Sequence, residues 1–353
     1  MRGRLIAVIG VALCVQPTLG ALPTYRAAVY VPPVPVNSTS IPFSGNLVDY
    51  TIGSYIVRAG GVPVHKSTFG VPMFHEIFQA MPGVYRAESG NNTGNGFVYQ
   101  GRFTSFQQEL GWGITKTHGV SPNGYITGSN YWSDGDGGGG SYGFGYNPIT
   151  KHSFQVELGK FTQCRGGNSK GQFIFETDGF DDDYFGGDAV MYDSNTNEFF
   201  SLGGRYRPYA VLEDGTVFGA YGSIYRWTKE RGREEFYDPR MNVVVIESVT
   251  QRGRVFGGGL GEGGGTSRDT GMFIFENGQI SKLIDLVPQF DKSVLELGWG
   301  HQTPEGVIFL GAYNKVSKTW TNYRLDPVPE PASLLVLGLG VAALQRRRRM
   351  SPR

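Results

Sequence analysis

Apolar residues in this chain alternate with polar ones over short runs, and glycines or other turn-forming residues separate the runs. A period of two is typical of strands that bury one face, whereas helices repeat their apolar positions every three to four residues. Between the two termini, only residues 74–81 hint at helical spacing. The pattern therefore predicts an all-β protein built from many short strands.

A recurrent unit organises residues 45–327. Its first half is a turn, a glycine, an apolar strand and a second glycine, as at 123–128, 214–219, 252–257 and, more loosely, 305–311. Its second half is a strand, a turn and a strand, as at 146–158, 189–202 and 272–283. In the last of these the turn is Asn277-Gly278, a strong hairpin signal.

Tandem four-stranded units of roughly 40–50 residues are the repeat of a β-propeller, because each sheet exposes an apolar face that only its neighbour covers. The units are expected near 83–110, 114–158, 164–202, 208–240, 246–286 and 297–327, and residues 45–80 complete or close the ring. We predict a β-propeller-like array of about six to seven four-stranded units. An irregular β-sandwich or a solenoid with similar hairpins is the alternative.

The N-terminus has the pattern of a secretory signal peptide, residues 1–21. Arg2 and Arg4 precede an apolar stretch at 5–15, and small residues follow near a cleavage point at Gly20 or Ala21, so a signal helix is expected. Leu13 before Cys14 is too large for a lipoprotein cleavage site. The proline-rich residues 22–44 suit an extended edge segment or a semi-rigid linker.

The C-terminus, residues 328–353, combines three features in a fixed order. Val328, Pro329, Glu330 and Pro331 come first, an apolar segment at 334–344 follows, and the cluster Arg346, Arg347, Arg348 and Arg349 closes the pattern. The prolines hold the first part extended. The apolar segment makes a helix of about 16 Å at 1.5 Å per residue. A bilayer needs roughly 20 residues, so this is a marginal transmembrane helix. The arginines favour retention on the cytoplasmic side.

This order of features closely resembles the PEP-CTERM sorting signal of exported Gram-negative bacterial proteins. The resemblance implies export by the Sec machinery, cleavage by signal peptidase, and cleavage near Pro329-Glu330-Pro331 by an exosortase-type membrane transpeptidase. It implies an inner-membrane-tethered intermediate that passes to the cell surface or the extracellular matrix. An unprocessed membrane anchor is the alternative. The repeat unit partly resembles HAF-type extracellular repeats, with their Ala-Phe pair replaced here by pairs such as Met272-Phe273.

Charge and cysteine content narrow the function classes. Without the seven arginines of the two terminal segments, 25 basic residues face 31 acidic ones, a net charge of −6. The body therefore lacks the basic footprint of a nucleic-acid partner. Cys164 is the single cysteine of the body, so no internal disulfide forms. We expect it to be a buried, inert thiol.

Two acidic loops are candidate calcium sites, since carboxylate oxygens are preferred calcium ligands. One contains Asp178, Asp181 and Asp183 with Asp188 close by; the other is the stretch 133–136 before a glycine run. Neither has the glutamate that an EF-hand places at its twelfth position, and a solvated turn is the simpler interpretation. No cofactor is expected, with calcium as the open candidate.

Other catalytic motifs are incomplete. His75-Glu76 begins a zinc-protease motif, but Gln79 stands where the second histidine belongs. No Gly-x-Ser-x-Gly elbow occurs in the body. The tryptophans suit the blade cores better than a carbohydrate-stacking surface; they are Trp112, Trp132, Trp227, Trp299 and Trp320.

Two functions remain from different classes. The first is a non-enzymatic structural or ligand-binding protein of the surface or matrix, with extracellular polysaccharide as a candidate partner. The second is a secreted polysaccharide hydrolase or lyase, whose site on a propeller would assemble from residues far apart in sequence. Two or more carboxylates near the central axis, with no arginine pairing them, would favour the enzyme.

Overall fold

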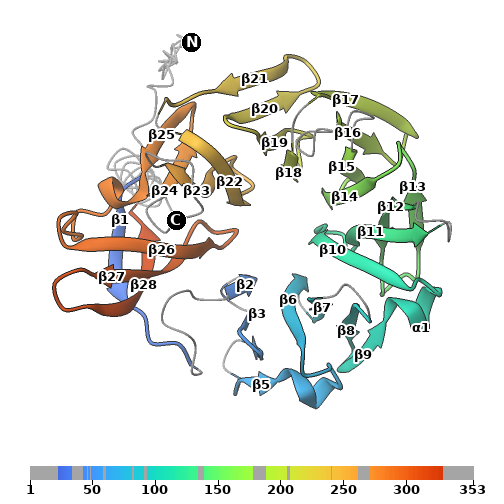
Figure 1. Cartoon of the computed structure of the whole chain (residues 1–353), viewed down its shortest axis with the longest axis horizontal. Coiled ribbons are helices and arrows are strands. Elements are labelled where there is room, and N and C mark those ends of the chain that lie inside the picture. Colours follow the sequence, from blue (N-terminus) through green and yellow to red (C-terminus); the bar gives the residue numbers. More distant parts are fainter. Residues whose placement is uncertain are drawn as a thin grey trace, which may run out of the picture.

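The computed structural model describes residues 23–328 apart from 34–42, 46, 48, 59–60, 82, 91–93, 134–138, 178–187, 205–206, 240 and 261–270. In this part of the chain, the strands form seven antiparallel four-stranded sheets. The sheets follow one another around a ring, with the first strand of each nearest the centre (Figure 1). The protein is an all-β, seven-bladed propeller. The expected signal helix and C-terminal transmembrane helix fall outside the described residues.

The blades are numbered in chain order. Blade 1 contains β2 (Phe43–Gly45), β3 (Asp49–Ile52), β4 (Tyr55–Arg58) and β5 (Val64–His65). Blade 2 contains β6 (His75–Met81), β7 (Val84–Ser89), β8 (Gly96–Tyr99) and β9 (Arg102–Ser105). Blade 3 contains β10 (Ile114–Val120), β11 (Ile126–Ser133), β12 (Gly139–Tyr146) and β13 (Ser153–Val156). Blade 4 contains β14 (Thr162–Gly167), β15 (Gln172–Thr177), β16 (Asp188–Asp193) and β17 (Glu198–Gly204).

Blade 5 contains β18 (Arg207–Val211), β19 (Val217–Ala220), β20 (Ile224–Thr228) and β21 (Gly232–Phe236). Blade 6 contains β22 (Met241–Val249), β23 (Val255–Leu260), β24 (Gly271–Glu276) and β25 (Gln279–Lys282). Blade 7 contains β26 (Leu295–Gln302), β27 (Ile308–Asn314), β28 (Thr319–Pro327) and β1 (Tyr25–Val29). The helical elements of the described chain are α1 (Phe106–Leu110) and the 3-10 turns η1 (Lys66–Phe69) and η2 (Leu283–Leu286).

The ring closes by joining the two ends of the chain in blade 7. Strand β1, from the proline-rich stretch, is the outer strand of this blade and pairs antiparallel with β28, from Tyr25 opposite Pro327 to Val29 opposite Tyr323. The ladder continues past both strands, since the Val328 amide donates to the Thr24 carbonyl at 2.9 Å. Residues about 300 positions apart therefore complete one sheet.

A separate hydrophobic cluster fills each junction between neighbouring blades. Tyr25 and Leu310 of blade 7 pack with Ile274 of blade 6, for example, and Ile77 and Tyr85 of blade 2 pack with Ile56 of blade 1. Seven such clusters of buried residues occur in the described chain, one for each junction. Each blade thus buries its apolar faces only against its neighbours, as expected of a propeller.

The second glycine of the recurrent unit has a direct structural cause. In the three regular copies of the unit, the second glycine lies on the second strand of its blade and faces an aromatic side chain of the third strand, as in Gly128 with Phe144 and Gly257 with Phe273. A Cβ atom at Gly257 would stand 2.3 Å from the Val245 carbonyl oxygen and 2.7 Å from the Phe273 ring. Only glycine allows this close approach of strand and ring. The Asn277-Gly278 turn has positive φ at both residues, as the hairpin prediction requires.

The helical spacing at 74–81 is a wrong prediction. Residues His75–Met81 form strand β6, in which His75 and Ile77 are buried while Glu76 between them is exposed. This alternation is the period of a strand, and the apparent helical spacing comes from Phe74, Ile77, Phe78 and Met81, which stand three or four positions apart. The α-helix of the described chain is α1, which a capping box at Ser105 begins and Gly111 ends.

Candidate functional site: a charged cluster on the inner strands

The inner strands share an irregularity at one position. In β10, β14, β18 and β22 the pairing with the second strand skips one residue, and the skipped residues are His118, Arg165, Tyr209 and Glu247. Each lies three positions before the first residue of the turn that connects the inner strand to the second strand of its blade. A β-bulge leaves its extra residue outside the ladder and re-aims the side chain, and bulges are common beside functional sites. Four consecutive inner strands thus carry bulged residues at equivalent places.

His118 lies between a serine and an arginine. Its Nε2 atom is 3.0 Å from the Ser129 hydroxyl, and its Nδ1 atom is 3.3 Å from Nη1 of Arg165 in the next blade. A guanidinium group only donates, so Nδ1 accepts and the ring proton resides on Nε2, which donates to Ser129. Burial and then the nearby cations, Arg165 first, hold the pKa of His118 well below its usual range. The imidazole is therefore neutral at physiological pH.

Arg165 connects His118 to a buried carboxylate. Its Nε atom donates to Glu176 at 2.6 Å, and its Nη2 atom forms an ion pair with the same carboxylate. Arg207 of blade 5 donates to the other oxygen of Glu176 at 3.3 Å. Burial raises the pKa of the bulged Tyr209, and the positive charge of Arg207 partly offsets that effect. Two guanidinium groups thus share one carboxylate across the junction of blades 4 and 5.

A second pair extends the cluster toward blade 2. Arg86 donates to the carbonyl and hydroxyl oxygens of Thr117 at 3.2 and 3.1 Å, and it forms an ion pair with Glu88. The Thr117 hydroxyl also donates to Glu88. The guanidinium of Arg86 lies 4.5 Å from the centre of the Phe78 ring. Both carboxylates described so far are therefore paired with arginine.

We refer to these side chains together as the bulge cluster: Arg86, Glu88, Lys116, Thr117, His118, Ser129, Arg165, Glu176, Arg207 and Tyr209. Four of them are cations and two are carboxylates, while His118 is neutral. The cluster therefore carries an excess of positive charge within a body that is acidic as a whole. Burial of its carboxyl group raises the pKa of Glu247, one blade further, although the residue as a whole is exposed.

The candidate sites from the sequence lie elsewhere. Asp178, Asp181 and Asp183 fall outside the described residues, and Asp188 is exposed at the start of β16. Within the described ranges, no group of three or more His, Cys, Asp or Glu side chains is placed to hold a metal ion. Of the sorting signal, Val328 is described and residues from Pro329 onward are not. No helix in the described ranges is long and apolar enough to cross a bilayer.

Cys164 and the tryptophans belong mostly to the packing. Cys164 is fully buried beside Phe173 and Phe175, and burial raises the pKa of its thiol. Trp227 is buried between blades 4 and 5, and Trp112 packs on Phe144 with ring centres 4.8 Å apart. Trp132 is 37% exposed. Trp320 lies against Tyr313, and the side chain of Trp299 is outside the description.

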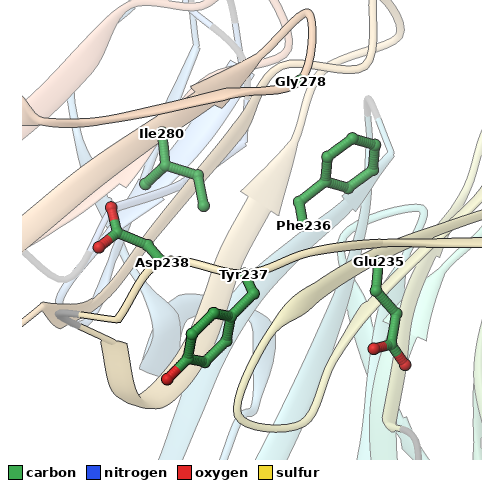
Figure 2. A pocket seen from close by; sticks show the side chains of 6 residues that line it. All are labelled: Glu235, Phe236, Tyr237, Asp238, Gly278 and Ile280. Atoms are coloured by element: carbon green, nitrogen blue, oxygen red, sulfur yellow. The ribbon is translucent and has the colours of Figure 1, made fainter.

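A surface pocket lies on the rim of the ring, between blades 5 and 6. It is lined by Glu235, Phe236, Tyr237, Asp238, Gly278 and Ile280. Figure 2 shows Phe236 directed toward Gly278, while Glu235 and Tyr237 extend from the opposite side of the strand. Phe236 also packs against the core of this junction. Of the two carboxylates in its lining, Glu235 forms an ion pair with Arg233 and Asp238 is buried. The bulge cluster is the stronger candidate site.

Sequence reasoning did not find the bulge cluster. Its members come from six strands, and no two of the bulged residues are close in sequence. One signal was available in four of the units, whose turns begin with Ser121, Asn168, Leu212 and Thr250. In each of these four, the residue three positions before the turn is polar. The interpretation as a site still requires the structure, because pairing across blades brings these residues together.

Comparison with known proteins gives a family for the C-terminal segment. Residues 327–349 match the family model of the PEP-CTERM protein-sorting motif. The search of curated proteins returned no match.

Three solved structures illustrate the likeness in fold. A puromycin hydrolase mutant in complex with PGG is similar at 9% identity and TM-score 0.48, over 86% of this chain and 58% of that one. The Dos1 propeller is similar at 8% identity and TM-score 0.40, over 86% and 94% of the two chains. Trypanosoma rangeli sialidase is similar at 7% identity and TM-score 0.38, over 93% and 58%. At these identities and TM-scores none of the three informs the function of this chain.

Proposed function

For a seven-bladed propeller that ends in a PEP-CTERM protein-sorting motif, we propose a role as an exported, membrane-sorted protein of the cell surface or extracellular matrix that binds a ligand and catalyses no reaction. The observation that carries the proposal is the motif at 327–349, which begins at the last residue of β28. The Sec machinery exports the chain, signal peptidase removes residues 1–21, and an exosortase-type transpeptidase cleaves near Pro329-Glu330-Pro331.

The geometry of blade 7 suits attachment of the protein to the membrane through its C-terminal tail. Tyr25 and Pro327 lie opposite each other, so both ends of the folded body leave from one corner of one blade. Leu325 of β28 pairs with Ile308, which directly follows the turn between β26 and β27. The tail therefore emerges at the end of the blade that carries this turn. The opposite end of the ring points away from the membrane while the tail is attached.

The contacts of the bulge cluster favour binding over the alternative of a polysaccharide hydrolase or lyase. Glycoside hydrolysis uses two carboxyl groups free to act as acid and as base or nucleophile. Glu88 and Glu176 are instead neutralised by arginine.

The Ser129–His118 pair does not supply a serine nucleophile either. A catalytic histidine accepts from serine through Nε2 while an acid holds its Nδ1–H. Here Arg165 occupies Nδ1, so Nε2 donates to Ser129 and cannot take its proton.

The proposed sorting is tested by removing residues 329–353, a deletion that leaves β28 and the Val328 hydrogen bond intact. We expect the truncated protein to be soluble in the periplasm or medium, because it lacks the apolar segment and the arginines. The measurement is immunoblotting of cell fractions. Fractionation identical to that of the full chain would contradict the proposal.

A second variant separates processing from plain anchoring. Pro329→Ala combined with Pro331→Ala keeps the apolar segment and the arginine cluster. We expect this variant to accumulate uncleaved in the membrane while the wild-type chain moves to the surface or matrix. If the wild type also stays uncleaved in the membrane, the tail is a plain anchor.

A further inference from the structure

Solvent reaches the innermost strands of the propeller. Lys116 on β10 is exposed, and Ile114 at the start of the same strand is 47% exposed. The side chain of Arg207 on β18 is 51% exposed although its guanidinium contacts Glu176. Charged groups of the bulge cluster are thus accessible to a ligand in the centre of the ring.

A buried carboxylate orients Arg207, one of the two accessible cations. Glu176 is buried and binds both Arg165 and Arg207, so it fixes two guanidinium groups across the junction of two blades. Lys116 lies two residues before His118 on β10, in the blade that precedes this junction. Arg86, Lys116, Arg165 and Arg207 all lie close enough to His118 to lower its pKa, and Glu88 and Glu176 pair with the three arginines among them. The cluster keeps an excess of positive charge, and Glu176 orients Arg165 and Arg207.

We propose that the bulge cluster binds carboxylate groups of an acidic polysaccharide, with Lys116 and Arg207 as the contacting cations. This inference rests on the proposed export, which brings the cluster into contact with extracellular polymers. Arg207 presents planar guanidinium donors suited to a carboxylate, and the exposed ammonium of Lys116 adds a point charge. The hydroxyl group of Tyr209, which interacts with Arg207 and whose ring packs on the core between blades 5 and 6, adds a hydrogen-bonding group beside these cations.

A charged sugar polymer fits the cluster better than a nucleic acid. Double-stranded DNA carries one charge per about 1.7 Å, and its binding needs many unpaired cations. The cluster has an excess of two positive charges over its two carboxylates, and the acidic body around it repels a dense polyanion. A polysaccharide with one carboxylate per sugar requires only these few cations. Its hydroxyl groups match the polar side chains of the inner strands.

The test uses the full chain in detergent and oligogalacturonate as the probe, with isothermal titration calorimetry as the measurement. We expect binding that weakens about tenfold in Arg207→Gln and in Lys116→Gln, since a charge-assisted hydrogen bond contributes about 1.5–3 kcal/mol and 1.4 kcal/mol is tenfold. Arg231→Gln and Lys151→Gln are the matched controls. Both change exposed cations on hairpin turns of the blades, away from the inner strands, and should leave binding unchanged.

Two further ligands complete the experiment. Fully methyl-esterified oligogalacturonate, which has the same sugars without charge, should bind at least tenfold more weakly, and a single-stranded DNA oligonucleotide of equal charge should bind no better than the ester. Equal binding of acid and ester, tighter binding of DNA, or unchanged affinity in both cluster variants would overturn the inference. Correct sorting without oligogalacturonate binding would refute only this inference, whereas failure of sorting would refute the proposed function.

Discussion

Deletion of residues 24–30 is expected to abolish cooperative folding of the propeller. The deletion removes β1 and with it Tyr25, which is fully buried in the core between blades 6 and 7. Loss of one such aromatic side chain costs about 3–5 kcal/mol, and whole domains are stable by only about 5–15 kcal/mol. The open edge of β28 and the loss of ring closure add to this cost. Urea denaturation of the purified chain, followed by circular dichroism, measures the effect.

Two neighbouring proline substitutions provide the matched control for this prediction. Thr24 accepts from Val328, and the Tyr30 amide donates to Asn322, so even-numbered residues of β1 form the hydrogen bonds to β28. Ala28→Pro therefore removes a donor from the ladder, whereas Val29→Pro changes an amide that points away from it. Both side chains are exposed. Equal unfolding midpoints for the two variants, or a cooperative transition in the deletion at the wild-type midpoint, would show that β1 does not close the ring.

Glu176→Gln is expected to destabilise the propeller by about 3–5 kcal/mol, the usual cost of removing one partner of a buried ion pair. Glu176 is 8% exposed and binds guanidinium groups from blades 4 and 5. The neutral amide leaves Arg165 and Arg207 facing each other without a counter-charge. Chemical denaturation at neutral pH gives the change in the free energy of unfolding.

Glu234→Gln is the control for this substitution. Glu234 pairs with Arg226 on the outer strands of blade 5, where both side chains are about one-third exposed. Solvent screens an ion pair of this kind, so its loss changes stability little. If the two glutamine variants are equally stable, Glu176 does not hold the blades together. The account of a pre-oriented bulge cluster would then lose its support.

The fold could be predicted because short-range turns and close contacts determine which residues stand at particular positions in the sequence. Gly257 permits close contact with Phe273, and Asn277-Gly278 requires positive φ, so both leave a direct mark in the sequence. The seven-bladed ring of four-stranded sheets confirms the expected six to seven units. Residues 43–65 form blade 1, largely within the segment at 45–80 expected to complete or close the ring.

Non-local features were harder to predict. The strand Tyr25–Val29 has one fully buried side chain and lies beside several prolines, so its sequence fitted an edge segment and a linker equally well. Its partner is about 300 residues away. The bulge cluster was equally hard to predict, because His118 and Arg165 come into contact only when two blades pack together. The sorting signal, by contrast, is contiguous and is confirmed by the family match at 327–349.

The most direct test of the account is the intact mass of the protein recovered from the extracellular fraction. The account predicts a chain that begins near Ala21 and ends between Val328 and Pro331, with the apolar segment and the arginine cluster removed. A mass corresponding to a chain that still reaches Arg353 would contradict it.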